Sequence, residues 1–217
     1  MVSTTATRYR PINLSAWEVR AIIEGRKTQT RRMVNYLPRL GKVTCIGGSE
    51  TTGYDFCLRD KRDMWNEFRE DELLKLCPFG QPGDHLFGRE KFCDRAEYGS
   101  LAKAMKLRIA YAADGTEKRE GWKWRPSTQM PRWASRETLR IKSVRIERLQ
   151  EISEADAIAE GARPLPLQSA DDPSAWWEID FGQHQCRTPR GVIRSLWQSS
   201  WDANPWVWVI EHERITK

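Results

Sequence analysis

The chain has 217 residues, a formal net charge of +6 and a pI near 9.2. This length suits a single domain, and the positive charge, which is spread along the chain, favours an anionic partner such as a nucleotide or nucleic acid. The sequence contains no apolar run long enough to span a membrane and no signal peptide, so we expect a cytoplasmic protein without a membrane partner.

The first regular elements expected are a strand and a capped helix. Ser15 followed by Glu18 has the spacing of a capping box, and the apolar positions after it predict a helix over residues 16–24. Gly25 is placed to end this helix, and a turn then leads into a strand that ends at residue 34. Further strands are predicted over residues 11–14, 85–90, 107–112, 139–150 and 206–215.

The remaining elements follow from local spacing and turn residues. The apolar pattern shifts phase near Ser143, which predicts a bulge in the strand over residues 139–150. The segment 122–135 is rich in Trp, Pro and Arg and is predicted to be an ordered loop. Helices are predicted over residues 64–76, 154–160 and 191–201.

The balance of these elements predicts the fold class. Strands outnumber helices and turns separate them, which is typical of an α+β fold in which helices flank a small mixed β-barrel. We expect one domain over residues 1–217, with two irregular insertions at about 38–75 and 163–188.

The cysteines do not suggest a metal site. Five cysteines without a Cys-x-x-Cys pair are interpreted as reduced thiols. A zinc site would need His85 or His184 as further ligands, but the usual ligand spacing is missing. We therefore expect no metal and no cofactor.

The stretch GRKTQTRR, residues 25–32, concentrates charge beside two threonines. A free lysine, with a pKa of about 10.4, is protonated at neutral pH, but nearby cations and partial burial lower that value. Such a lysine could take the proton of a threonine hydroxyl, as nucleophilic catalysis requires. The cations expected to act on Lys27 in this way are Arg26, Arg31 and Arg32. The alternative is a solvated basic turn.

Geometry constrains this hypothesis. Lys27 and Thr30 are three residues apart and would face opposite sides of a straight strand. Both side chains can reach one pocket only if Lys27 lies in the turn, before the strand begins.

Five short motifs in order suggest a family. They read GRKTQTRR, PGDHLFGRE, MPRWASR, VRIERLQEISEADAIAEG and LWQSSWDANPWVWVIEHERI. In these motifs the chain resembles the ASCH domain family of PUA-like β-barrels, in the version carried by tailed phages and prophages. The resemblance spans roughly residues 9–215 and is thin in the two insertions. The chain departs from it at Gly88, where relatives often have a bulkier residue, and this glycine could loosen a pocket wall.

The resemblance implies an activity. Some small ASCH proteins are metal-independent amidohydrolases that remove the acetyl group from N4-acetylcytidine with a Lys, a Thr and a Glu. By motif these residues fall on Lys27, Thr30 and Glu160. Glu160 would protonate the leaving amine or bind the cytosine amino edge. The alternative for Glu160 is an exposed carboxylate at a helix end.

Further residues are candidates for substrate binding. They are Arg26, Arg31, Arg32, Arg89, Glu90, Trp133, Ser135 and Arg136. Arg89 and Glu90 could instead form a structural salt bridge, and Trp133 could close the barrel mouth rather than stack on a base.

Two other functions stay open. The chain could be a binding module for RNA or a modified base, with arginines on phosphates. It could also be a ribonuclease, although it lacks a His pair or a carboxylate cluster for that chemistry. The resemblance implies a modified nucleoside, a nucleotide or RNA as the partner, in a bacterial host cell.

Overall fold

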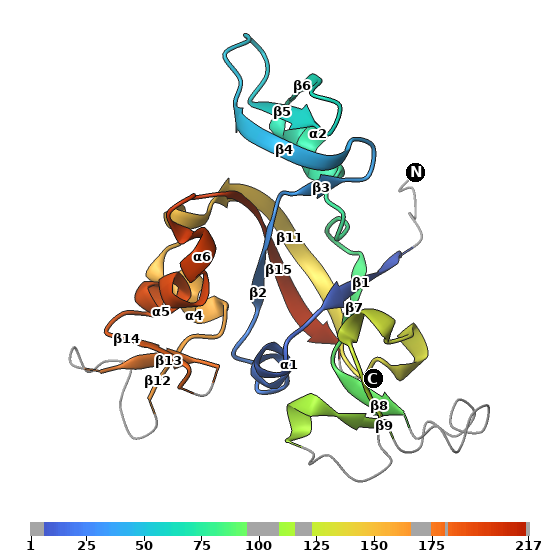
Figure 1. The fold of residues 1–217 in the computed structure, drawn as a ribbon, viewed down its shortest axis with the longest axis vertical. Coiled ribbons are helices and arrows are strands. Elements are labelled where there is room, and N and C mark those ends of the chain that lie inside the picture. The colour runs from blue at the N-terminus through green and yellow to red at the C-terminus, as the bar shows by residue number, and fades with distance from the viewer. Residues whose placement is uncertain (1–6, 95–108, 116–122, 166–174, 181, 216–217) are drawn as a thin grey trace.

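The computed structural model describes residues 7–94, 109–115, 123–165, 175–180 and 182–215. The fold is α+β, with most regular residues in strands and few in helices (Figure 1). The described strands form four sheets. No described helix has the length and apolar character needed to cross a membrane.

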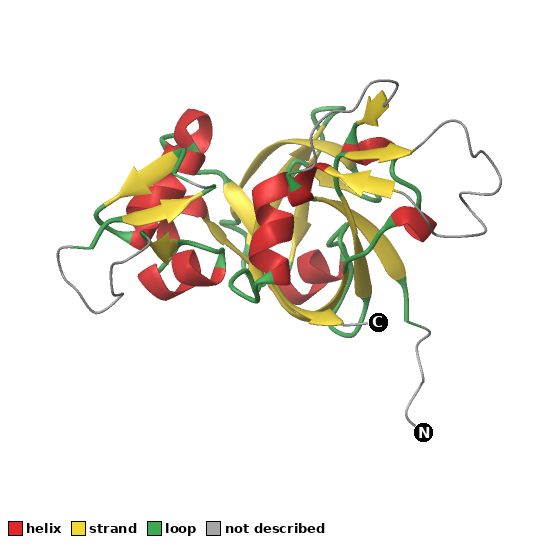
Figure 2. Ribbon diagram, turned by 90° about the horizontal axis from the view of Figure 1, so that it is seen from below, coloured by secondary structure: helices red, strands yellow, loops and turns green. Residues whose placement is uncertain are grey.

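The central sheet has five strands in the order β1-β7-β11-β15-β2. It pairs β1 with β7 in parallel and the other neighbours antiparallel. The bounds are Tyr9–Asn13 for β1, His85–Arg89 for β7, Thr138–Arg148 for β11, Trp206–Ile215 for β15 and Gln29–Met33 for β2. The long strands of this sheet curve around the core (Figure 2).

The expected barrel is not closed. Within the described residues, no ladder joins the edge strands β1 and β2. A side chain spans the gap instead, because Arg32 Nη2 on β2 donates to the carbonyl oxygen of Asn13 on β1 at 2.9 Å. The bulge predicted near Ser143 is confirmed: the register of β11 against β15 shifts between Ile141 and Ser143, which bends the strand.

Helix α1 (Ala16–Ile23) begins as the sequence predicts. The Ser15 side chain accepts from the backbone of Glu18, and Glu18 Oε2 accepts from the backbone of Ser15 at 2.8 Å. These two bonds form the capping box. Gly25 follows with a φ of +75°, a left-handed conformation that suits glycine. Since β2 starts only at Gln29, Lys27 lies in the turn before the strand. This is the position that Lys27 needs if its side chain and that of Thr30 are to reach one pocket.

The segment expected to be the first insertion folds into a four-stranded sheet, drawn at the top of Figure 1. Its strands are β3 (Tyr36–Leu37), β4 (Gly41–Gly48), β5 (Phe56–Asp60) and β6 (Trp65–Phe68), and α2 (Glu70–Lys75) follows. The helix predicted over residues 64–76 is therefore wrong in its first half. Strand β6 pairs with β5 there. The spacing of apolar residues alone does not decide between helix and strand in so short a segment, and the pairing with β5 makes it a strand.

Two smaller three-stranded sheets complete the strand content. One contains β10 (Lys123–Arg125), β8 (Phe92–Asp94) and β9 (Ile109–Tyr111). The other contains β12 (Arg163–Pro164), β13 (Trp177–Ile179) and β14 (His184–Cys186). Part of the predicted strand 107–112 and part of the second insertion lie outside the described residues.

Short helical turns connect these parts. They are η2 (Ala112–Asp114), η3 (Ser127–Gln129), η4 (Arg132–Ala134) and η5 (Leu149–Glu151). The helices near the C-terminus are α4 (Glu154–Ala159), α5 (Pro189–Leu196) and α6 (Gln198–Trp201). The single helix predicted over residues 191–201 is thus two helices, separated at Trp197.

Strand β15 separates two apolar cores. Trp208 and Ile210 pack into the core that the central sheet shares with the first insertion. Val207 and Val209 pack on the opposite face, against residues of α4, α5 and β13. Because successive residues of a strand point to opposite faces, β15 supplies side chains to both cores. Its pairing with β2 also fixes the position of β15 side chains relative to those of β2.

Trp208 tests this arrangement. Its side chain is fully buried, so Trp208→Ala leaves a large cavity and is expected to lower the free energy of unfolding by about 3–5 kcal/mol. Urea unfolding measures this loss. The control is Trp65→Ala, which removes a side chain that is 56% exposed and is expected to cost less than about 0.5 kcal/mol. Equal losses in the two variants would contradict the assignment of the core.

Candidate functional site

Lys27 lies in a turn that is tied to two helices. Its backbone N–H donates to Ala21 O of α1 at 3.0 Å, and the N–H of Thr28 donates to Ala159 O of α4 at 2.8 Å. The side chain is buried, with the residue only 2% exposed. Its ammonium group contacts Glu160 Oε2 and also donates to the Glu160 carbonyl oxygen at 3.1 Å.

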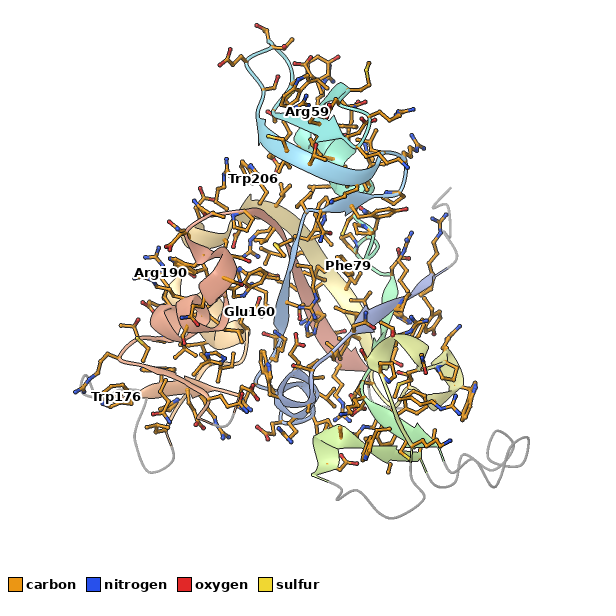
Figure 3. All side chains as sticks on the ribbon, viewed as in Figure 1. Arg59, Phe79, Glu160, Trp176, Arg190 and Trp206 are labelled. Carbon is orange, nitrogen blue, oxygen red and sulfur yellow. The ribbon has the colours of Figure 1, made fainter. Side chains whose placement is uncertain are left out.

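Glu160 ends α4 and faces inward. It is the C-cap of that helix, and the next residue, Gly161, has a φ of +114°. Its carboxylate is shared, since Oε2 contacts Lys27 and Oε1 lies 3.3 Å from Arg31 Nη1. The residue is 5% exposed and lies between β2 and the C-terminal helices (Figure 3). The alternative of an exposed carboxylate is wrong.

The charges around Lys27 differ from those expected. The ammonium group faces two carboxylates, that of Glu160 in direct contact and that of Glu18 at 3.9 Å, and the Trp17 ring lies 5.2 Å away. The neighbouring arginines pair with carboxylates of their own. These pairs are Arg26 with Glu24 at 2.6 Å, Arg31 with Glu147 at 2.6 Å and Arg32 with Glu18 at 3.0 Å. Lys27 therefore lies in an ion-pair network.

Thr30 is joined to a residue that the sequence did not reveal. Thr30 pairs with Ile210 in the ladder between β2 and β15, so His212 lies diagonally across from it on the same face. The Thr30 Oγ1 and His212 Nε2 atoms are 3.2 Å apart, and both residues are buried. Only the register of the two strands reveals this contact.

The environment keeps His212 neutral. Burial, reinforced by the nearby charges of Lys27 and Arg32 and opposed by Glu18, lowers its pKa to about 3. At neutral pH the imidazole therefore has one N–H and one acceptor nitrogen. The Lys27 charge thus acts on the residue that holds the Thr30 hydroxyl.

Glu18 is the second anion of this region. Burial alone would raise its pKa, but the charges of Arg32 and Lys27 and the hydrogen bond from Ser15 outweigh that effect and lower the pKa to about 2. Glu18 therefore caps α1, binds Arg32 and carries a negative charge close to Lys27.

A second set of charges lies behind Glu160. Arg31, with a fully buried side chain, contacts Glu147 and Asp156, and Asp156 also lies 3.0 Å from Arg145. The Gln29 side chain donates to Asp156 Oδ1 at 2.9 Å. These bonds hold the arginine that fixes Glu160 Oε1. Arg31 is therefore placed to position the site rather than to touch a substrate.

The other predicted residues lie near β7. Arg136 makes a two-point contact with Glu90, at 2.7 and 3.0 Å, and also pairs with Asp114. Burial raises the pKa of Glu90 although Arg136 opposes this effect. The Ser135 hydroxyl donates to the Gly88 carbonyl oxygen at 2.8 Å. These contacts stabilise the end of the sheet.

Gly88 does not loosen a pocket wall. A Cβ atom on this buried glycine would lie 2.8 Å from Leu14 Cδ1 and 3.3 Å from Glu137 Cβ. The glycine therefore lets Leu14 and Glu137 approach the strand closely.

Trp133 belongs to a different region from Lys27. It is 38% exposed and lines a cavity of about 640 Å³ with Tyr9, His85, Phe87, Arg132, Ser135, Thr138 and Ile215. None of Lys27, Thr30 and Glu160 lines that cavity. The structure therefore brings Lys27 and Glu160 into contact, places Thr30 on the following strand against His212, and places Trp133 and Ser135 elsewhere.

Comparison of the chain with protein-family models, curated proteins and solved structures finds no match. The ASCH assignment therefore rests on the five sequence motifs. In the described part of the chain, no cluster of three or more His, Cys, Asp or Glu side chains is arranged to hold a metal ion.

The neutral state of His212 has a measurable consequence. Between its unfolded pKa of about 6.5 and its folded pKa of about 3, only the unfolded chain protonates this histidine, so stability falls as the pH drops through this window. The loss is at most about 1.4 kcal/mol per pH unit. Urea unfolding at pH 7, 6, 5 and 4 is expected to show a shallower decline for His212→Gln than for the unmodified chain.

His184→Gln is the matched control, because it removes another of the chain's three histidines. An unchanged pH dependence in His212→Gln would contradict the buried, neutral state of His212. A nuclear magnetic resonance titration gives an independent readout, in which the His212 ring signals stay constant from pH 7 to pH 4.

Proposed function

We propose that this protein is a metal-independent amidohydrolase that acts on N4-acylated cytosine nucleosides or nucleotides, such as N4-acetylcytidine. The observation that carries the proposal is the contact between Lys27 and Glu160, two residues 133 positions apart, in which Lys27 lies in the turn before the strand of the buried Thr30. The motifs of the ASCH resemblance select these same three residues. That resemblance also supports a PUA-like fold, a phage or prophage origin and action in the cytoplasm of a bacterial host.

Thr30 is the nucleophile in this proposal, and His212 orients it. His212, with a pKa of about 3, is a weak base at neutral pH, because general bases work best when their pKa lies near the working pH. Its neutral ring can still donate Nε2–H to Thr30 Oγ1, which orients the oxygen and leaves the hydroxyl proton free to move to another base. The stronger base available to Thr30 is the amine of Lys27.

Lys27 becomes a base by passing a proton to Glu160, which it already contacts. The Lys27 amine then takes the Thr30 proton while Oγ1 bonds to the acyl carbon. The C–N bond breaks, and protonated Glu160 gives its proton to the cytosine amine. Water hydrolyses the resulting Thr30 ester, releases the carboxylic acid and restores the hydroxyl.

The route to Thr30 in this proposal passes Arg32. Lys27, Thr30 and Glu160 are each 5% exposed or less, whereas the Arg32 side chain is 27% exposed. Arg32 swings away from Glu18 to admit the substrate and then faces the acyl oxygen or a phosphate. Exclusion of water from the closed site strengthens each of these interactions.

The test compares two threonines of the same turn and strand. Thr30→Val removes the buried hydroxyl at nearly constant volume, while Thr28→Val changes an exposed threonine two residues earlier. Chromatography of cytidine released from N4-acetylcytidine is expected to show a loss of at least about 10³-fold for Thr30→Val and full activity for Thr28→Val. Full activity in Thr30→Val would reject Thr30 as the nucleophile.

Lys27→Met and Glu160→Gln complete the series. Each is expected to lower the rate by about 10²–10⁴-fold, because each removes one of the two proton-transfer groups. Circular dichroism and urea unfolding identify variants that lose the fold instead of the chemistry. If the unmodified protein releases no cytidine from N4-acetylcytidine or longer N4-acyl cytosines, the proposal fails.

A further inference from the structure

The cavity that contains Trp133 lies on the face of the central sheet opposite the main core. Tyr9 pairs with His85, Phe87 pairs with Thr138, and Thr138 pairs with Ile215, so these residues share one face. The residues between them on the strands point the other way, into the main core, and include Ile12, Leu86 and Leu139. The turn η4 supplies Arg132 and Trp133 as the other wall.

The walls of this cavity are aromatic and partly accessible. Tyr9 is 42% exposed and Trp133 is 38% exposed. The Tyr9 and His85 rings meet edge to face, with their centroids 4.9 Å apart, and Phe87 adds a third ring to this face. A volume of about 640 Å³ is within the range of sites for small organic molecules. Exposed aromatic faces suit a flat ligand that can stack.

The cavity carries positive charge. The Arg132 guanidinium lies 3.6 Å from the centroid of the Tyr9 ring. Arg89 lies 5.3 Å from the Phe87 ring. Within the described residues its side chain donates to Thr128 O alone, at a long 3.4 Å, and its Nε atom is buried without a partner. Among the described residues, no carboxylate pairs with either arginine, and no Asp or Glu lines the cavity.

The arginines of the Lys27 region behave differently. Arg31, Arg32 and Arg145 each pair with at least one carboxylate. The cavity also contains a histidine with an unused polar atom, since His85 Nδ1 is buried and has no hydrogen-bond partner in the described part of the chain. Two arginines that pair with no described carboxylate, together with the His85 ring, thus gather around an aromatic cavity. Such a site attracts an anion that carries a flat ring.

We propose that this cavity binds a nucleotide unit, with its base stacked against Trp133 or Tyr9 and its phosphate held by Arg132 and Arg89. The site is separate from the Lys27 cluster and does not depend on the proposed hydrolase activity. The unit is either a free nucleotide or one residue of a single-stranded nucleic acid, because both present the same base and phosphate.

Calorimetric titration of the full chain tests this proposal. The probes are cytidine 5′-monophosphate, cytidine, inorganic phosphate and a short single-stranded oligonucleotide. Binding that needs base and phosphate together, and that weakens as salt rises, is the expected result. Binding of the mononucleotide identifies a free nucleotide as the source, and binding of the oligonucleotide alone identifies a polymer. If neither binds, or if cytidine binds as tightly as the monophosphate, the proposal is wrong.

The chain offers matched variants. Arg132→Gln and Trp133→Ala are each expected to weaken nucleotide binding by about tenfold or more. Their controls are Arg59→Gln and Trp65→Ala, a half-buried arginine and an exposed tryptophan on another sheet with 5.7 Å between guanidinium and ring. Equal affinities in all four variants would overturn the site.

Lys27→Met separates this proposal from the hydrolase. Nucleotide binding that survives in Lys27→Met but weakens in Arg132→Gln supports a separate site, even if the protein hydrolyses no acylated cytosine. Binding that is lost in Lys27→Met and retained in Arg132→Gln would assign the nucleotide to the Lys27 cluster and reject the cavity.

Discussion

The buried contact between Lys27 and Glu160 is the constraint on which the candidate site depends. A charge removed from water needs a partner of opposite sign, and removing one member of such a pair typically costs about 3–5 kcal/mol. This contact ties the turn before β2 to the end of α4, which are 133 residues apart. It also places the Lys27 charge near His212, where it lowers the pKa of the ring, and His212 in turn contacts Thr30. The position of Thr30 relative to the charges therefore follows from one ion pair and the ladder between β2 and β15.

The network around this pair has a chemical consequence. Glu160 is shared between Lys27 and Arg31, so two cationic side chains hold its carboxylate in place. The outer carboxylates Glu147 and Asp156 in turn hold Arg31. Such an arrangement holds Lys27 and Glu160 in contact and in fixed orientation, as their proposed acid–base roles require.

Local signals in the sequence predict part of this structure well. The capping box of Ser15 and Glu18 and the bulge at Ser143 depend on neighbouring residues, and both are found. The motifs also select Lys27 and Glu160, which are in contact in the structure. His212 escapes prediction because its contact with Thr30 depends on strand register, which a single sequence does not display.

The errors have a similar origin. The short strand that begins at Trp65 was predicted as helix, because its conformation depends on the partner strand β5 rather than on its own four residues. The closed barrel was inferred from the number of strands, whereas closure depends on whether β1 and β2 share a ladder. The positive surroundings expected for Lys27 came from counting neighbours in sequence, but folding pairs those arginines with carboxylates from distant segments.

The central claim is that Thr30 forms a covalent bond to the acyl group of the substrate. Rapid acid quenching of the protein during turnover of N4-acetylcytidine, followed by peptide mass spectrometry, tests this claim most directly. The account predicts one acetyl group on the peptide that contains Thr30, absent from the same peptide of Thr30→Val. Turnover with the acetyl group on a different residue, or with the Thr30 peptide unmodified at every quench time, would contradict it.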